Sequence, residues 1–141
     1  MSHNKHRSLF AIYTLIFAIG AVGYYLLELL WRGRSHISMA LCGGVCLCSV
    51  CAANTALSHK PIYVRSAVGA LIITAIEFVF GCVLNLAWGL GVWDYSSQPL
   101  NLAGQICPLY SLLWYMLCIP ICALHRLILR LRQPAKVNIL P

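Results

Sequence analysis

Four long apolar runs divide this chain, and each is long enough to cross a lipid bilayer as a helix. A membrane-spanning helix needs about 20 apolar residues, because the hydrocarbon core is about 30 Å thick. The runs cover residues 8–30, 37–57, 64–87 and 106–126. Hydrophobic residues make up 61% of the chain and charged residues 9%, which is typical of integral membrane proteins. We therefore expect an all-α membrane protein, with residues 1–141 forming a single four-helix transmembrane domain.

Basic residues are distributed unevenly between the two sides of this predicted bundle. If the amino terminus is cytoplasmic, only Arg32 and Arg34 fall outside. Cytoplasmic segments usually carry the excess of lysine and arginine, so we predict a multi-pass protein of the cell membrane with both termini in the cytoplasm and a basic tail over 127–141. The net charge of +7 then favours contact with anionic lipid, not nucleic acid. The eight basic residues placed inside are Lys5, Arg7, Lys60, Arg65, Arg126, Arg130, Arg132 and Lys136.

The eight cysteines raise the alternatives of a metal site or a disulfide framework. On a helix, Cys42 and Cys46 share one face, whereas Cys48 and Cys51 point largely away from it. One straight helix cannot close a tetrahedral thiolate site. Cysteines in apolar segments instead act as small residues that let helices approach closely, as glycine does in Gly43-Gly44. We expect no metal and no cofactor.

The three acidic residues all fall toward the predicted outer face. Glu28 lies near the outer end of the first span, Glu77 lies about 20 Å along the third, and Asp94 lies in the outer connection. An ionisable side chain inside the bilayer costs at least ~2.5 kcal/mol, so it is retained where it is paired or faces a wet cavity. Glu28 and Arg32 have the spacing and order of a helical ion pair. The alternative is that these groups only anchor a helix end or hold the bundle together.

The outer connection over residues 88–105 gathers polar side chains within an apolar segment. Glu77, Gly81 and Asn85 precede it at helical spacing, so an acid and an amide share one stripe with space between them. We expect the connection to fold back as a re-entrant or interfacial loop and Asp94 to pair with Arg32 or Arg34. The candidate substrate-binding or functional cluster is Glu28, Arg32, Arg34, His36, Glu77, Asn85, Trp93, Asp94, Tyr95, Asn101 and Gln105.

Three motifs occur together and in order: WRGRSH at 31–36, WDYS at 93–96 and NLAGQI at 101–106. With these motifs the chain resembles the ABC-transporter type IV, or CmpB-like, family of small membrane proteins. The resemblance covers roughly Tyr25 to Trp114. It implies a transport role without naming a substrate or an ATPase partner.

Two classes of function remain open. The first is a membrane transport or permease-type subunit with a polar, charge-paired vestibule at the outer face. Four helices are too few to enclose a sizeable pathway, so this subunit is expected to form a homo-oligomer or to join other membrane subunits in the lipid bilayer. The second is a small membrane enzyme acting on a lipid-linked or anionic substrate, gripped by arginines and activated by a carboxylate as general base. No catalytic residues can be named for it, and the resemblance favours the first class.

Overall fold

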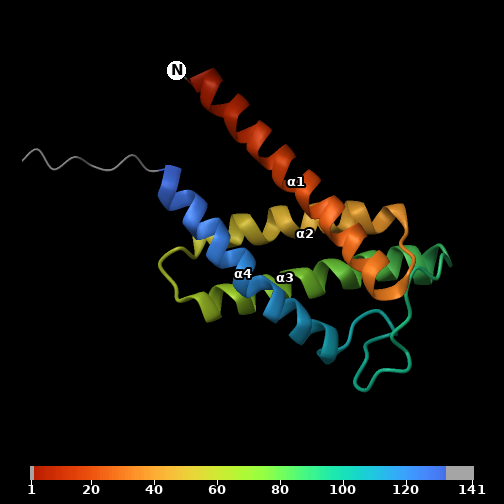
Figure 1. Cartoon of the computed structure of the whole chain (residues 1–141). Coiled ribbons are helices and arrows are strands. Elements are labelled where there is room, and N and C mark those ends of the chain that lie inside the picture. Colours follow the sequence, from red (N-terminus) through yellow and green to blue (C-terminus); the bar gives the residue numbers. More distant parts are fainter. Residues whose placement is uncertain (1, 133–141) are drawn as a thin grey trace, which may run out of the picture.

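The computed structural model describes residues 2–132, and within them the ordered elements are helices (Figure 1). Four helices are long and apolar enough to cross a membrane, with η1 continuing α3 as one span. The predicted all-α fold with four spans is therefore confirmed, and the protein is a multi-pass membrane protein. The elements are α1 (Ser2–Arg32), α2 (Ile37–Ala56), α3 (Ile62–Gly81), the π-helical segment η1 (Cys82–Ala87) and α4 (Pro108–Arg132).

One difference from the predicted bounds is at the end of α4. Residues 127–132 were expected to belong to a tail, but they continue the helix to Arg132. Leu131 follows Leu127 and Ile128 by four and three positions, so one apolar stripe runs through the basic segment and supports a helix there. Residues 133–141 of the expected tail lie outside the described part of the chain.

The helices pack around a core that α2, α3 and α4 share. Cys42 and Cys46 from α2 meet Ile73 from α3 and Cys118 from α4, and all four side chains are buried. The eight cysteines are free thiols. Those on α2 and α4 therefore serve mainly as the small packing residues that were expected.

Helix α1 packs against α2 and leaves a gap toward α4. Among the described helices, α1 approaches only α2 backbone to backbone. At the crossing of α1 and α2, a Cβ added to Gly43 would lie 2.5 Å from the carbonyl oxygen of Gly20. The first half of α1 stands apart from the other helices in Figure 1, and Phe10 and Leu15 are exposed there. Because the backbone of α1 approaches only that of α2 among the described helices, the contacts of α1 with α3 and α4 are made by side chains.

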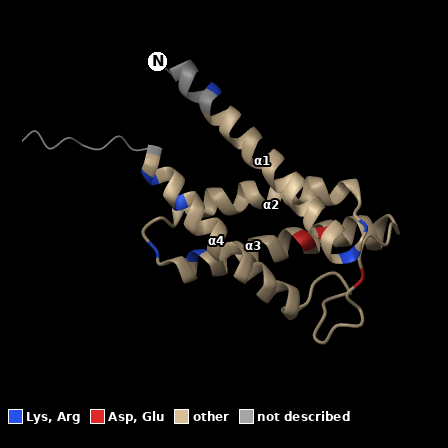
Figure 2. Ribbon diagram, in the orientation of Figure 1, with Lys and Arg blue, Asp and Glu red and all other residues tan. Residues whose placement is uncertain are grey.

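Charged residues separate between the two ends of the bundle (Figure 2). The acidic residues gather at the end where the α1–α2 connection and the long loop, residues 88–107, lie; we call this the loop end. Arg32 and Arg34 lie at this end as well, whereas the basic residues of α3, of α4 and of the α2–α3 connection lie toward the opposite end. The structure therefore brings the three carboxylates to one end, as the sequence predicted.

Candidate functional site

Glu28 and Arg32 form an ion pair in the last turns of α1. Arg32 donates through Nη2 to Glu28 Oε1 and through Nη1 to the carbonyl oxygen of Val92, over 3.1 Å. The hydroxyl of Ser35 donates to the other oxygen of Glu28 over 2.7 Å. The predicted helical pair is therefore present, and it also ties α1 to the long loop.

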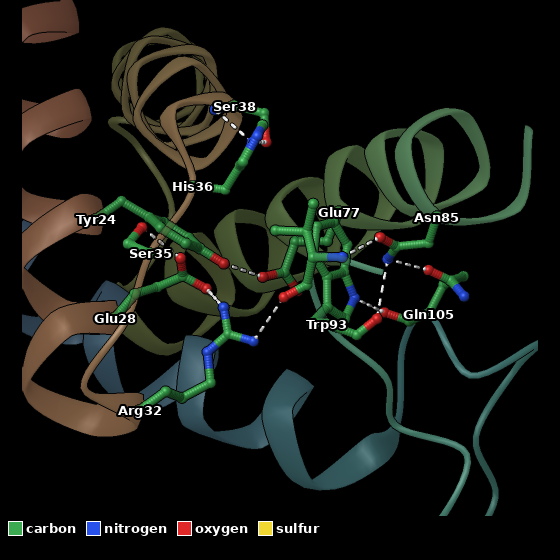
Figure 3. A network of polar contacts seen from close by, with 11 residues as sticks. Tyr24, Glu28, Arg32, Ser35, His36, Ser38, Glu77, Asn85, Trp93 and Gln105 are labelled. Carbon is green, nitrogen blue, oxygen red and sulfur yellow. Dashed lines mark hydrogen bonds and ion pairs between the residues drawn. The ribbon is translucent and has the colours of Figure 1, made fainter. Parts of the chain in front are cut away.

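Glu77 lies deeper in the bundle and is 3% exposed. Its two oxygens accept hydrogen bonds from the Tyr24 hydroxyl on α1, over 2.5 Å, and from the Trp114 indole N–H on α4, over 2.7 Å. The rings of Tyr24 and Trp114 stack with their centroids 5.5 Å apart. One carboxylate on α3 thus joins three helices, and Figure 3 shows it pointing toward Tyr24.

Asn85 anchors the long loop to the end of the third span (Figure 3). Its amide donates to the Trp93 carbonyl over 3.0 Å and to Gln105 Oε1 over 2.8 Å, and its oxygen accepts from the Val92 N–H over 2.7 Å. The Trp93 indole donates to the Gln105 carbonyl over 2.9 Å. A Cβ added to Gly81 would lie 2.5 Å from Gln105 Oε1, so the predicted space beside this glycine holds the glutamine. These hydrogen bonds tie both ends of the loop to the end of the third span.

Asp94 does not form an ion pair with Arg32 or Arg34. Its Oδ1 accepts from the backbone N–H of Ser96 over 2.8 Å and from the Ser96 hydroxyl over 2.5 Å, and the side chain is exposed. These hydrogen bonds lower the pKa of Asp94 from its usual value. The expected pairing with Arg32 or Arg34 was wrong, because the ion pair found within residues 2–132 joins Arg32 to Glu28. A local turn satisfies the carboxylate instead.

Four further residues of the predicted cluster have separate positions. Arg34 and His36 are exposed, and the imidazole of His36 caps α2 by accepting from the Ser38 N–H over 3.2 Å. Asn101 holds the long loop together by accepting from the Gly104 N–H over 2.9 Å. Tyr95 stacks on Tyr110 of α4 with ring centroids 4.3 Å apart. Burial raises the pKa of Tyr95 well above its usual value, and the charge of Glu77 adds to this.

A cavity of about 330 Å³ fills the gap between α1, α4 and the long loop. Its charged lining is the Glu28–Arg32 pair, and the rest of its wall is aromatic or leucine. A second cavity of about 260 Å³ shares Tyr24, Leu27 and Trp114 with it and continues between α1, α2 and α4. The aromatic residues of the first cavity are Tyr24, Trp31, Tyr95, Tyr110 and Trp114.

Three hydrogen-bond donors were not predicted from the sequence: Tyr24 and Trp114, which donate to Glu77, and Ser35, which donates to Glu28. Tyr24 lies one helical turn before Glu28, so its spacing already placed it on the same face. Trp114 belongs to the segment that resembles the family, but its spacing gave no sign of a partner on α3. Ser35 precedes the cap of α2 and belongs to the WRGRSH motif, but nothing in its spacing indicated a contact with Glu28.

A second polar cluster lies near the start of α3, away from the loop end. Arg65 is 2% exposed and donates through Nε to Asn54 Oδ1 over 2.5 Å and through Nη2 to the Cys122 carbonyl over 3.1 Å. The Asn54 amide lies 2.7 Å from Nδ1 of His125. From the sequence, Arg65 was predicted only to be one of the basic residues on the cytoplasmic side. In the structure its side chain connects α2, α3 and α4.

No three histidine, cysteine, aspartate or glutamate side chains of the described chain are grouped so that they could hold a metal ion.

Comparisons with known proteins gave one match. The model of a family described as "Putative ABC-transporter type IV" matches residues 4–139, nearly the whole chain. Neither the curated proteins nor the solved structures gave a match. Because the family model covers far more than half of the chain, the protein belongs to the "Putative ABC-transporter type IV" family.

Proposed function

We propose that this protein is a membrane transport or permease-type subunit whose loop-end cavity is a polar vestibule for a small substrate. The observation that supports it most is the cavity itself, which has the charged pair Glu28–Arg32 in its wall and lies beside the buried carboxylate of Glu77. Membership of a family described as a transporter type agrees with this function.

The buried charges at the loop end favour a passage over a purely structural role. A structural cluster gains most from complete pairing, because an unpaired charge in a poorly hydrated site is costly. Here Arg32 faces Glu28, and the hydrogen-bond partners of Glu77 are neutral donors. One carboxylate therefore remains without a basic partner among the described residues, which suits a site that a proton or a cationic substrate completes.

The alternative, an enzyme that grips an anionic substrate with arginines, receives less support. Both terminal nitrogens of Arg32 are already engaged, one with Glu28 and one with the Val92 carbonyl. Arg34 is exposed in the α1–α2 connection. An anion would have to displace existing hydrogen bonds before Arg32 could bind it.

The proposed subunit lies in the cell membrane, with the loop end outside and both termini in the cytoplasm. Its lipid bilayer contact would be the broad apolar surface of α1, including the exposed Phe10 and Leu15. Since α1 approaches only α2 backbone to backbone among the described helices, the same surface could also pack against a second copy or another membrane subunit.

Complementation of cells that lack the protein tests this function. Wild-type protein should restore uptake or release of at least one small solute, measured by mass spectrometry of medium and cell extract. Glu77→Gln should not restore it, because the amide keeps the shape but removes the charge. The control is Asp94→Asn, which changes an exposed carboxylate outside the cavity and should restore transport.

Full restoration by Glu77→Gln, at a membrane level equal to that of wild type, would refute the proposed vestibule. If Asp94→Asn also lost transport, transport would depend on negative charge anywhere at the loop end. The specific role proposed for the buried carboxylate would then be refuted.

A further inference from the structure

The loop-end cavity carries the chemistry of an ammonium site. Resting on the proposed transport function, we propose that its substrate is a single-chain amphiphile with a quaternary ammonium head, which occupies the aromatic cavity while its alkyl chain lies in the second cavity. Three observations support this: the aromatic wall, the balance of charge and the apolar continuation.

Aromatic rings surround the cavity from three elements of the fold. Tyr24 and Trp31 come from α1, Tyr95 comes from the long loop, and Tyr110 and Trp114 come from α4. The negative faces of such rings attract cations, and cages of this kind recognise quaternary ammonium groups. A bulky alkylated ammonium also needs no hydrogen-bond acceptor, so a wall of rings can replace its weak hydration.

The charge balance at the loop end favours a cation over an anion. Arg32 is paired with Glu28, so the carboxyl group of Glu77 is the acidic group beside the cavity that has no basic partner among the described residues. Glu77 accepts hydrogen bonds from Tyr24 and Trp114, and both of these rings also line the cavity. A hydrogen bond from a ring O–H or N–H to a carboxylate increases the electron density of that ring, which strengthens its attraction for a cation. The buried glutamate would therefore act through the two rings as a positioning residue.

The second cavity offers a place for an apolar tail. It shares Tyr24, Leu27, Trp114 and Leu117 with the first cavity and continues past Ile121 between α1, α2 and α4. Its lining is apolar, and no charged side chain of the described residues contributes to it. A head that is fixed among the rings would thus place an alkyl chain along the bundle toward the opposite end.

Binding of radiolabelled decyltrimethylammonium to the full-length protein in dodecyl maltoside tests the inference. We expect saturable binding to wild type. Unlabelled tetramethylammonium, which has the head alone, should displace the label, whereas decyl sulfate, which has the same chain on an anionic head, should not. Displacement by decyl sulfate as effective as by the unlabelled cation would overturn the inference, because the site would then recognise only the chain.

Two pairs of variants identify the site. Tyr110→Leu should weaken binding by roughly 3- to 30-fold, whereas Tyr110→Phe, which keeps the ring, should bind within about twofold of wild type. Trp31→Leu and Trp31→Phe repeat the comparison at a side chain that is 70% exposed, where the fold does not depend on the indole. Equal affinities within both pairs would overturn the aromatic site.

This binding assay is independent of transport. If the protein binds the ammonium probe but restores no solute transport in cells, the result would support the binding site and refute the proposed function. A protein that restores transport but does not bind the probe would retain the function and refute this substrate class.

Discussion

Glu77 is the residue that most directly links the sequence to the site. A carboxylate buried among apolar helices loses its hydration, so it needs donors from its neighbours. Tyr24 and Trp114 supply them, and because they come from different helices, the carboxylate also fixes where α1 and α4 lie relative to α3. The same contact therefore serves both the stability of the bundle and the shape of the cavity.

Removal of one donor should reveal this contribution. Tyr24→Phe keeps the ring in the cavity wall but leaves one oxygen of Glu77 without its partner, so we expect a loss of about 1–3 kcal/mol in the free energy of unfolding. Denaturant unfolding in detergent measures it. Tyr25→Phe is the matched control, because it removes the hydroxyl of the next residue along the helix, which does not donate to Glu77. A loss for Tyr24→Phe no larger than for the control would contradict this role.

Arg65 is a buried charged residue at the opposite end of the bundle, and it too depends on neutral partners. Its guanidinium donates to the Asn54 amide oxygen and to the Cys122 carbonyl. Asn54→Ala removes the acceptor of its Nε, and we expect a loss of about 1–3 kcal/mol in unfolding free energy. Thr55→Ala is the comparison, because that exposed hydroxyl bonds only to its own helix at the Cys51 carbonyl. Equal stabilities of the two variants would show that the Arg65 contact is energetically neutral.

At the scale of helices, the close approach of α1 and α2 decides where the cavity lies. Membrane helices associate mainly through packing and hydrogen bonds, and small residues permit that packing. Gly20 and Gly43 meet backbone to backbone, and Gly44 faces the ring of Phe17. Because α1 is held against α2 in this way, its other side remains separated from α4, and the cavity occupies that gap.

Replacement of Gly43 by alanine tests this contact. The added Cβ would lie 2.5 Å from the Gly20 carbonyl oxygen, so α1 must move away, and we expect a loss of about 1–3 kcal/mol in stability. Gly23→Ala is the control on α1, since nothing lies within 4 Å of its added Cβ. Thermal unfolding in detergent should separate the two variants, and equal melting temperatures would refute the packing argument.

The four spans and the Glu28–Arg32 pair were predictable because each follows from local sequence. Apolar length sets the spans, and a four-residue spacing sets the pair. The partners of Glu77 and Arg65 were not predictable in this way. They depend on which helices become neighbours, and neither apolar length nor helical spacing specifies that arrangement. The predicted partner of Asp94 was wrong, because the prediction considered only the balance of charges and not the local turn in which Ser96 donates to this carboxylate.

At the scale of the whole molecule, the two ends of the bundle differ in charge and in shape. The loop end carries the carboxylates and the larger cavity, whereas basic residues gather toward the opposite end (Figure 2). Such a bias orients a protein in the membrane, with the more basic end in the cytoplasm. The vestibule would then face outward.

A reporter of sidedness fused after Pro141 tests that orientation. We expect activity only from a reporter that works in the cytoplasm, because four spans return the chain to the side where it started. The same reporter inserted in the long loop after Ser97, which is exposed, should give the opposite result. A carboxyl-terminal fusion active only outside would invert the topology and turn the vestibule inward.

Filling the loop-end cavity tests most directly whether it is the route of the substrate. Leu113 lines the cavity and is 43% exposed, so Leu113→Trp adds bulk to the cavity without entering the core. Leu112 is 53% exposed and lines neither cavity, which makes Leu112→Trp the matched control. With both variants at wild-type membrane levels, we predict that Leu113→Trp abolishes the solute transport that wild type restores, whereas Leu112→Trp retains it. Full transport by Leu113→Trp would contradict the assignment of this cavity as the vestibule.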